Sequence, residues 1–309
     1  MKKILVLFTV FFLFNAVNAY PQTMSKYGYP VSNKYNAGVS RLINSVDLYF
    51  SEDYMHYAEH SVNGTNAPLE PAGTTYDNEA AKLPGWGIDV SYFNKTMPIY
   101  YEFNLSNNAG KSNYSGGLEC NGVPCGYSSS IDGLMYLNYG AKLGYVFLFN
   151  DDQLALIPNA GYEYIDWNRN VINPDGSSNV EHYKLDRWLF GVTAFVKPLD
   201  SNFWAQVYGY YTLNYNNSMN RYSNALGQSI IYNLGGDNGY IFGGKIGYEA
   251  YKNNKLIISP YVGIDYIQNK EGRSNNIYYP NGSYSWEPQD QSNQLLFNLG
   301  IKVSFFSLF

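Results

Sequence analysis

The chain has 309 residues, of which 18% are aromatic and only 15% are charged, and its formal net charge is −5. An acidic balance argues against nucleic acid as a partner, because nucleic-acid-binding domains are usually basic. The composition includes 33 tyrosines, an excess expected where aromatic girdles mark both interfaces of a membrane.

The first residues have the pattern of a secretory signal peptide. Lys2 and Lys3 precede an apolar run at 4–14, and the small-residue site Val17-Asn18-Ala19 follows it. The run is shorter than the ~20 residues that a transmembrane helix needs. We therefore predict a signal peptide at 1–19, cut after Ala19, and an exported mature protein.

Residues 20–44 show no sustained period and are predicted to be a periplasmic lead-in, or a segment that folds back as a partial plug. From residue 45 to residue 309, apolar side chains recur at every second position in ten segments, which predicts ten β-strands. The predicted strands are 45–57, 86–92, 99–105, 137–149, 154–167, 183–196, 203–216, 240–251, 256–267 and 294–309.

The links between these strands alternate in length. The short links are 93–98, 150–152, 197–202 and 252–254. The long polar segments are 60–82, the Gly/Ser/Asn-rich stretch 106–136, a loop turning at 173–176, 218–237 and 270–291. Short turns on one side and long loops on the other are typical of an outer-membrane barrel.

The last strand shows the alternation most clearly. Its apolar positions are Leu295, Phe297, Leu299, Ile301, Val303 and Phe305. The positions between them are Asn298, Gly300, Lys302 and Ser304, which do not suit a hydrophobic core. This pattern predicts a polar lumen inside a barrel and lipid outside it.

A terminal aromatic residue preceded by apolar residues at alternate positions resembles the end of Gram-negative outer-membrane β-barrel proteins. Phe309, Phe305, Val303 and Ile301 carry the resemblance, and Ser307 interrupts the row. The chain looks like the small OmpA-like and opacity-type surface barrels of this class. The resemblance implies a transmembrane antiparallel up-and-down barrel in the bacterial outer membrane, surrounded by outer-membrane lipid. It also implies a terminal signal read by the outer-membrane assembly machinery.

A soluble barrel or sandwich with an apolar interior is the competing architecture. It would place charge on some of the faces assigned to lipid, and the central portions of these faces have almost none.

On this assignment of faces, acidic and basic side chains in the lumen nearly balance. The inward charged residues are Asp89, Glu102, Lys142, Glu163, Arg187, Lys197, Lys245, Glu249, Asp265 and Lys302. Unpaired charges in a narrow lumen are costly, so we predict a structural network of ion pairs that occludes the barrel. A selectivity-determining pore lining is the alternative.

The two cysteines, Cys120 and Cys125, lie in the segment Glu-Cys-Asn-Gly-Val-Pro-Cys. In an exported protein this pattern predicts a small disulfide-closed loop at the cell surface, with free thiols or a metal pair as alternatives. No nearby histidine completes a zinc site, and no phosphate-binding loop pattern is present. No metal or cofactor is therefore expected.

The three histidines are the candidates for catalysis. His56 and His60 lie at the top of the first strand, and His182 lies near Asp186 at the start of the sixth. An Asp–His pair at the rim could activate water. The motifs of known barrel hydrolases do not match this chain, so the sequence does not predict an enzyme.

The function predicted from these observations is a structural or surface-interaction role. Long loops rich in Asn, Ser, Gly and Tyr suit adaptable, adhesin-like contacts with a host or surface ligand. We expect a monomer. A narrow, porin-like diffusion channel is the first alternative, and a rim-located hydrolase is the second.

Overall fold

The computed structural model describes residues 38–60, 75–93, 97–120, 123–172, 178–198, 201–223, 228–234, 238–270, 272–273, 277–278, 284–285, 288–289 and 291–305. The predicted signal peptide, most of the lead-in and Phe309 lie outside the described residues. Within the described residues, no helix is long and apolar enough to cross a membrane.

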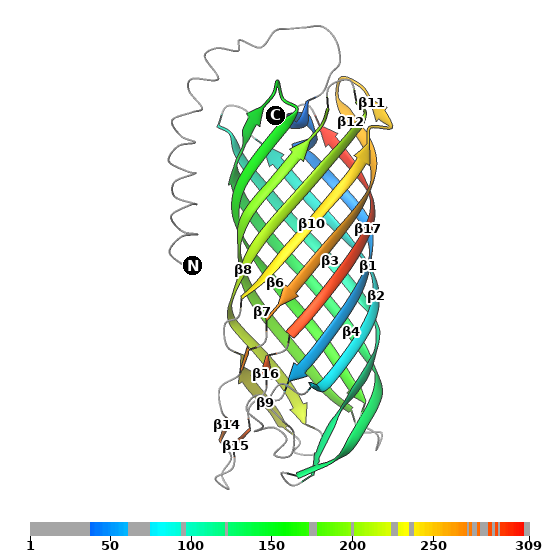
Figure 1. The fold of residues 1–309 in the computed structure, drawn as a ribbon, viewed down its shortest axis with the longest axis vertical. Coiled ribbons are helices and arrows are strands. Elements are labelled where there is room, and N and C mark those ends of the chain that lie inside the picture. The colour runs from blue at the N-terminus through cyan, green and yellow to red at the C-terminus, as the bar shows by residue number, and fades with distance from the viewer. Residues whose placement is uncertain are drawn as a thin grey trace.

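Ten long strands form one closed antiparallel barrel (Figure 1), as the alternation predicts. They are β1 (Ser45–His60), β2 (Thr75–Phe93), β3 (Ile99–Cys120), β4 (Val123–Tyr145), β6 (Leu154–Ile172), β7 (Ser178–Val196), β8 (Phe203–Ser223), β10 (Asn238–Tyr248), β12 (Leu256–Asn269) and β17 (Gln291–Phe305). Each pairs with the next long strand along the chain, and β17 pairs with β1. Closure leaves no unpaired sheet edge in the wall, which a strand protein needs in lipid.

Short elements complete the described chain. They are α2 (Val39–Ile43), β5 (Phe147–Phe149), β9 (Gln228–Asn233), β11 (Tyr251–Lys252), β13 (Gly272–Arg273), β14 (Ile277–Tyr278), β15 (Tyr284–Ser285) and β16 (Pro288–Gln289). The β9 strand extends the wall beside β8, whereas β13–β16 and β14–β15 form two small sheets in the last long loop. In Figure 1 the short-turn end is at the top and β9, β14 and β15 are at the bottom. By the class rule, the short-turn end is periplasmic.

A belt of exposed apolar side chains surrounds the barrel. Its members include Leu48, Phe50, Phe103, Leu143, Phe190, Val207, Phe242, Ile246, Val262, Leu299 and Ile301. Aromatic pairs border the belt: Tyr92–Tyr101 and Phe203–Tyr248 towards the periplasmic end, and Tyr139–Tyr164 and Tyr162–Trp188 towards the other. Such a belt between aromatic girdles is the surface that outer-membrane barrels present to lipid.

The belt gives a direct prediction for stability. Ile301 is 50% exposed on the outer face of β17, whereas Asn298 is buried in the lumen. We expect Ile301→Arg to destabilise the barrel by about 2–4 kcal/mol, because it places a charge against hydrocarbon. Asn298→Arg should cost less, since the new charge would face a polar lumen. Urea unfolding in lipid vesicles measures both changes, and equal costs would show that the two faces are wrongly assigned.

The polar stretch 106–136 was predicted to be a loop, and this prediction is wrong. Instead β3 continues to Cys120 and β4 starts at Val123, so that the two strands have 22 and 23 residues. A transmembrane strand needs only about 9–11 residues, so the hairpin extends the barrel wall well beyond the belt. The apolar alternation disappears there because the outer face meets water rather than lipid.

The link after β5 is a tight turn, as predicted. Asn150, Asp151 and Asp152 have successive positive φ angles of 53°, 52° and 68°. Asn and Asp adopt this left-handed conformation more readily than most residues. The turn brings Asp152 to the periplasmic mouth of the barrel, where it contacts α2.

Candidate functional site

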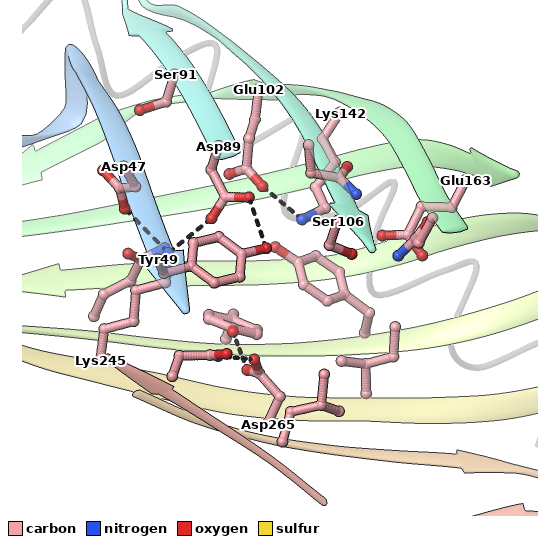
Figure 2. Close-up of a pocket in the computed structure, with 18 of the residues that line it drawn as sticks. Asp47, Tyr49, Asp89, Ser91, Glu102, Ser106, Lys142, Glu163, Lys245 and Asp265 are labelled. Atoms are coloured by element: carbon pink, nitrogen blue, oxygen red, sulfur yellow. Dashed lines mark hydrogen bonds and ion pairs between the residues drawn. The ribbon is translucent and has the colours of Figure 1, made fainter. Parts of the chain in front are cut away.

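The lumen contains a polar cavity of about 120 Å³. Figure 2 shows the side chains of Asp47, Asp89, Glu102, Lys142 and Lys245 turned towards this space. We call it the central chamber, and its charged lining residues are Asp47, Asp89, Glu102, Lys142, Glu163, Arg187, Lys245, Asp265 and Lys302.

One carboxylate in the chamber lies between two ammonium groups. The register of β1 places Asp47 opposite Lys302 of β17 and Asp89 of β2. The Lys302 Nζ lies 2.8 Å from Asp47 Oδ1. The Lys245 Nζ lies 3.1 Å from Asp47 Oδ2 and 2.9 Å from Asp89 Oδ2. Asp47 thus holds Lys302 and shares Lys245 with Asp89.

Two further ion pairs, and one carboxylate that is held by neutral hydrogen-bond donors, complete the chamber. Lys142 Nζ lies 2.7 Å from Glu102 Oε1. Arg187 Nη2 lies 2.6 Å from Glu163 Oε2, which also accepts a hydrogen bond from Arg187 Nε at 2.7 Å. Asp265 accepts instead from two neutral groups, the amide of Asn298 at 2.7 Å and the hydroxyl of Tyr208.

Two of the ten lumen charges singled out in the sequence lie elsewhere. Lys197 pairs with Glu249 at 3.4 Å, and Glu249 also lies 3.5 Å from Lys252. Lys197 and Glu249 directly follow the periplasmic ends of β7 and β10, Lys252 ends β11, and none of the three lines the chamber. The other eight do line it.

Asp47 is the central residue that the sequence analysis omitted. The alternation that turns Val46 and Leu48 outward also turns Asp47 inward, so a signal was present. Asp47 lies close to the start of the first predicted strand, where the assignment of inward and outward positions is least certain from sequence. With Asp47 included, every lysine and arginine of the chamber has a carboxylate within 3.1 Å.

A layer of apolar and aromatic side chains crosses the lumen on the extracellular side of the chamber. We call it the aromatic layer, and its buried members are Met55, Tyr57, Ala81, Leu83, Leu134, Tyr136, Ile165, Trp167, Tyr183, Met219, Tyr232 and Leu234. The Trp167 ring stacks on Tyr183 with centroids 4.4 Å apart and meets the edge of Tyr57 at 5.6 Å. A cavity of about 40 Å³ lies beside it.

This layer corrects the expectation of a uniformly polar lumen. Along β6, Glu163 faces the chamber, but the next inward residues are Ile165 and Trp167, while Asp166 and Asn168 face outward. The polarity of the two faces therefore inverts above the belt. The physical reason is that the outer face there meets water, so the barrel packs its interior as a soluble protein does.

A buried charge cluster lies on the extracellular side of the aromatic layer. Arg169 is 4% exposed, and its Nε lies 2.9 Å from Glu79 Oε2 and 3.7 Å from Asp132 Oδ2. Its Nη1 lies 3.0 Å from Glu181 Oε2. The guanidinium also lies over the ring of Tyr57. All four charged residues fall outside the predicted strands, which is why the sequence analysis missed them.

The periplasmic end of the lumen is apolar as well. Val39 and Ile43 of α2 pack in a buried cluster with residues of four strands and the chain around β5: Phe93, Tyr100, Val146, Ala155, Ile157 and Phe195. Leu42 packs with Trp204, Ile257 and Tyr261. The chamber is thus bounded by packed apolar layers at both ends.

His182 does not pair with Asp186, the nearby acid that the sequence offered as its candidate partner. His182 Nε2 instead lies 2.8 Å from Asp166 Oδ1 on the outer wall, and Asp186 accepts a hydrogen bond from Tyr162. His182 and Asp186 are four residues apart on one strand face, too far to touch, whereas Asp166 is a cross-strand neighbour. His56 is exposed on the outer face, and the side chain of His60 lies outside the described residues.

Cys120 ends β3 and Cys125 lies just inside β4, across a hairpin whose register shifts between Leu118 and Glu119. The two side chains are outside the described part of the structure, so the disulfide stays a prediction. We expect mass spectrometry of non-reduced peptides to recover the two cysteines in one linked species. The closed loop is short, so Cys120→Ser with Cys125→Ser should barely change barrel stability. Two free thiols in the native protein would contradict this expectation.

The described residues contain no group of three or more His, Cys, Asp or Glu side chains that could hold a metal ion. The charged clusters of the lumen are instead built around Arg169, Lys245 and Lys302. Their chemistry is that of ion pairing in a closed interior.

Comparisons with known proteins agree with this architecture. No family model matches the chain, and no curated protein sequence matches it. The crystal structure of the outer membrane protease OmpT from Escherichia coli is similar at a TM-score of 0.57 and 13% identity, over 85% of this chain and 97% of that chain. The transport unit of the autotransporter AIDA-I from Escherichia coli matches at a TM-score of 0.47 and 10% identity, over 93% and 98%. These identities show a shared fold alone.

The protein has the fold of an outer-membrane β-barrel. Its closed wall, apolar belt and aromatic girdles, together with that fold, locate it in a bacterial outer membrane.

Proposed function

We propose that the protein is a monomeric, non-conducting surface barrel whose wall above the membrane contacts molecules outside the cell. The occluded lumen is the observation that carries the proposal. In the described structure, the aromatic layer and the apolar periplasmic end bound the chamber, and both consist of buried side chains. A narrow channel would need a continuous polar path through both.

The wall beyond the belt supports a contact role. On the outer face of β3, Lys111, Asn113 and Ser115 are exposed, and on β2 Asn78 and Lys82 are exposed. Their polar groups suit a host or surface ligand that is recognised by hydrogen bonds. Outer-membrane lipid around the belt and the assembly machinery acting on Phe309 complete the set of proposed partners.

The first test is electrical. We expect the purified protein to show no steady ion conductance in a planar lipid bilayer, because the chamber is bounded by packed apolar side chains at both ends. Lys302→Ala or Glu163→Ala should not open it, since neither residue belongs to those layers. A large, stable and ion-selective conductance of the unmutated protein would favour the channel instead.

The second test concerns the wall. Replacing residues 116–128 with Asn-Gly shortens the β3–β4 hairpin but leaves the pair Ser115–Ser129 in register. We expect bacteria with this variant to adhere to host-cell monolayers no better than bacteria lacking the protein, while the barrel remains folded. Full adhesion by the shortened variant would exclude the hairpin as the contact surface. Equal adhesion with and without the whole protein would exclude the adhesin-like role.

A hydrolase is the second candidate, and one contact favours it. Asp166 orients the imidazole of the half-buried His182 at 2.8 Å, and the similar OmpT structure is that of a protease. An Asp–His pair can serve as a general base. Incubating outer-membrane preparations with a peptide mixture tests this role. Cleavage that disappears in His182→Ala but persists in His56→Ala would establish it, whereas no cleavage would remove it.

A further inference from the structure

The short helix α2 closes the periplasmic mouth of the barrel without belonging to its wall. Figure 1 shows it in blue at the short-turn end. Val39, Leu42 and Ile43 are 0% exposed, because their side chains point into the mouth. They pack into two buried apolar clusters on the inner surfaces of the strands, which we call the apolar seats of α2.

A carboxylate in the periplasmic turn after β5 holds the N-terminal end of α2. The backbone oxygen of Asp152 accepts a hydrogen bond from Val39 N at 2.7 Å. Its side chain accepts from Ser40 N at 2.9 Å and from Ser40 Oγ at 2.5 Å. Gly38 makes this approach feasible, because a Cβ there would lie 2.2 Å from Asp152 Oδ2. We call the contact of Gly38, Val39 and Ser40 with Asp152 the latch.

The C-terminal end of α2 is tied to the barrel by different bonds. The oxygen of Ile43 accepts from Ser91 Oγ at 2.5 Å, and the Asn44 side chain accepts from Phe93 N at 2.5 Å. The backbone oxygen of Asn44 accepts from Phe305 N at 2.8 Å. Asn44 directly precedes β1, so α2 can swing about this residue without breaking any strand pair.

The seat of α2 is also the floor of the central chamber. The Lys302 ammonium lies 5.5 Å from the ring centroid of Trp204 and 5.8 Å from that of Phe195. Trp204 packs against Leu42, and Phe195 lies in the cluster of Val39 and Ile43. These rings and α2 therefore lie between the Lys302–Asp47 pair and the periplasmic mouth.

The extracellular boundary of the chamber is of a different kind. Tyr57, Trp167 and Tyr183 of the aromatic layer belong to paired strands of the wall itself. Strand pairing holds their backbones in place, whereas α2 pairs with no strand of the sheet.

We propose that α2 is a removable periplasmic plug, latched by Asp152, over a chamber that the aromatic layer keeps closed towards the cell exterior. Release of α2 opens the chamber to water and small ions from the periplasm alone. The device does not depend on an adhesin-like role and produces no conductance, so its test is independent of the function proposed above.

The test measures access to the chamber from each side. Ser106 lines the chamber, so Ser106→Cys, in a chain carrying Cys120→Ser and Cys125→Ser, reports entry of a small charged thiol reagent. In a porin-deficient strain, intact cells expose only the outer side to the reagent, and osmotically shocked cells expose the periplasmic side as well. We expect slow labelling of this parent chain under both conditions.

The latch variant is Asp152→Gly, which removes the carboxylate and suits the positive φ at this position. We expect it to raise labelling about tenfold or more in shocked cells, because it removes two hydrogen bonds to a charged group, and to leave labelling in intact cells unchanged. Asp151→Gly is the matched control. It alters the same turn at an exposed residue with φ 52° and should leave both rates at the parent level.

Leu42→Asp provides a second route, because it places a charge in the apolar seat and should expel α2 even with the latch intact. Each variant is first checked for the folded barrel by its altered gel mobility when unheated. The proposal is overturned if folded Asp152→Gly and Leu42→Asp proteins both label at the parent rate in shocked cells. Fast labelling of the parent chain in shocked cells would show that α2 is no plug, and a rise in intact cells would refute the one-sided closure.

Discussion

Replacing Asp47 with asparagine is expected to destabilise the barrel by about 3–5 kcal/mol, the usual cost of removing one partner of a buried ion pair. Lys302 is 2% exposed, and Asp47 is the carboxylate that contacts it. The variant would therefore leave an ammonium group buried without a counter-charge. Urea unfolding in lipid vesicles, followed by tryptophan fluorescence, measures the change.

Asp89→Asn is the matched control for this experiment. Asp89 shares Lys245 with Asp47, so its loss leaves Lys245 with a carboxylate at 3.1 Å and should cost clearly less. The double variant Asp47→Asn with Lys302→Met should recover much of the lost stability, because it removes the stranded charge together with its partner. Equal costs for Asp47→Asn and Asp89→Asn would contradict the assignment of Asp47 as the residue that holds Lys302.

The sequence predicts the part of the fold that the membrane constrains. Lipid on one side and a polar lumen on the other force strict alternation, as in Leu299, Gly300, Ile301 and Lys302, and the structure turns these side chains outward and inward as expected. Ten strands, four short turns and closure follow from that signal. The same alternation identifies charged residues that the barrel brings together in one chamber, such as Lys142 and Glu102.

The signal is lost where the membrane ends. Residues of the β3–β4 hairpin such as Lys111 and Asn113 face water, so no apolar row marks the strand, and the polar stretch wrongly predicts a loop. The ion pairs in the lumen depend on register between strands far apart in sequence, as for Asp47 and Lys245. Alternation fixes which face a residue occupies but not which partner lies opposite, so only the closed barrel defines the pairs.

The position of α2 could not be predicted for a related reason. The segment Val39–Ile43 is too short to show a helical period, and its apolar residues occur in a stretch rich in polar ones. Its buried position comes from the fit of three side chains into seats that exist only once the barrel has closed. A partial plug is one of the two alternatives that the sequence allows for residues 20–44, and α2 is the described segment that occupies the mouth.

Arg169→Met is expected to cost about as much as Asp47→Asn, because it removes the guanidinium that neutralises Glu79, a fully buried carboxylate above the aromatic layer. Arg221→Met is the control. Its guanidinium is 35% exposed and lies 3.6 Å from Glu181, so its loss should cost about 1 kcal/mol or less.

Acid should separate this electrostatic cost from a packing defect. At pH 5 the Glu79 carboxylate of the variant takes up a proton more readily than at pH 7.5, which removes the uncompensated charge, so the stability gap between variant and parent should narrow. A gap that stays constant between these pH values would mean that Arg169 acts through its packing on Tyr57 and Tyr114 rather than through its charge. Adding Glu79→Gln to Arg169→Met should recover part of the loss at pH 7.5 and little at pH 5, because only the charged form of Glu79 is costly once its partner is gone.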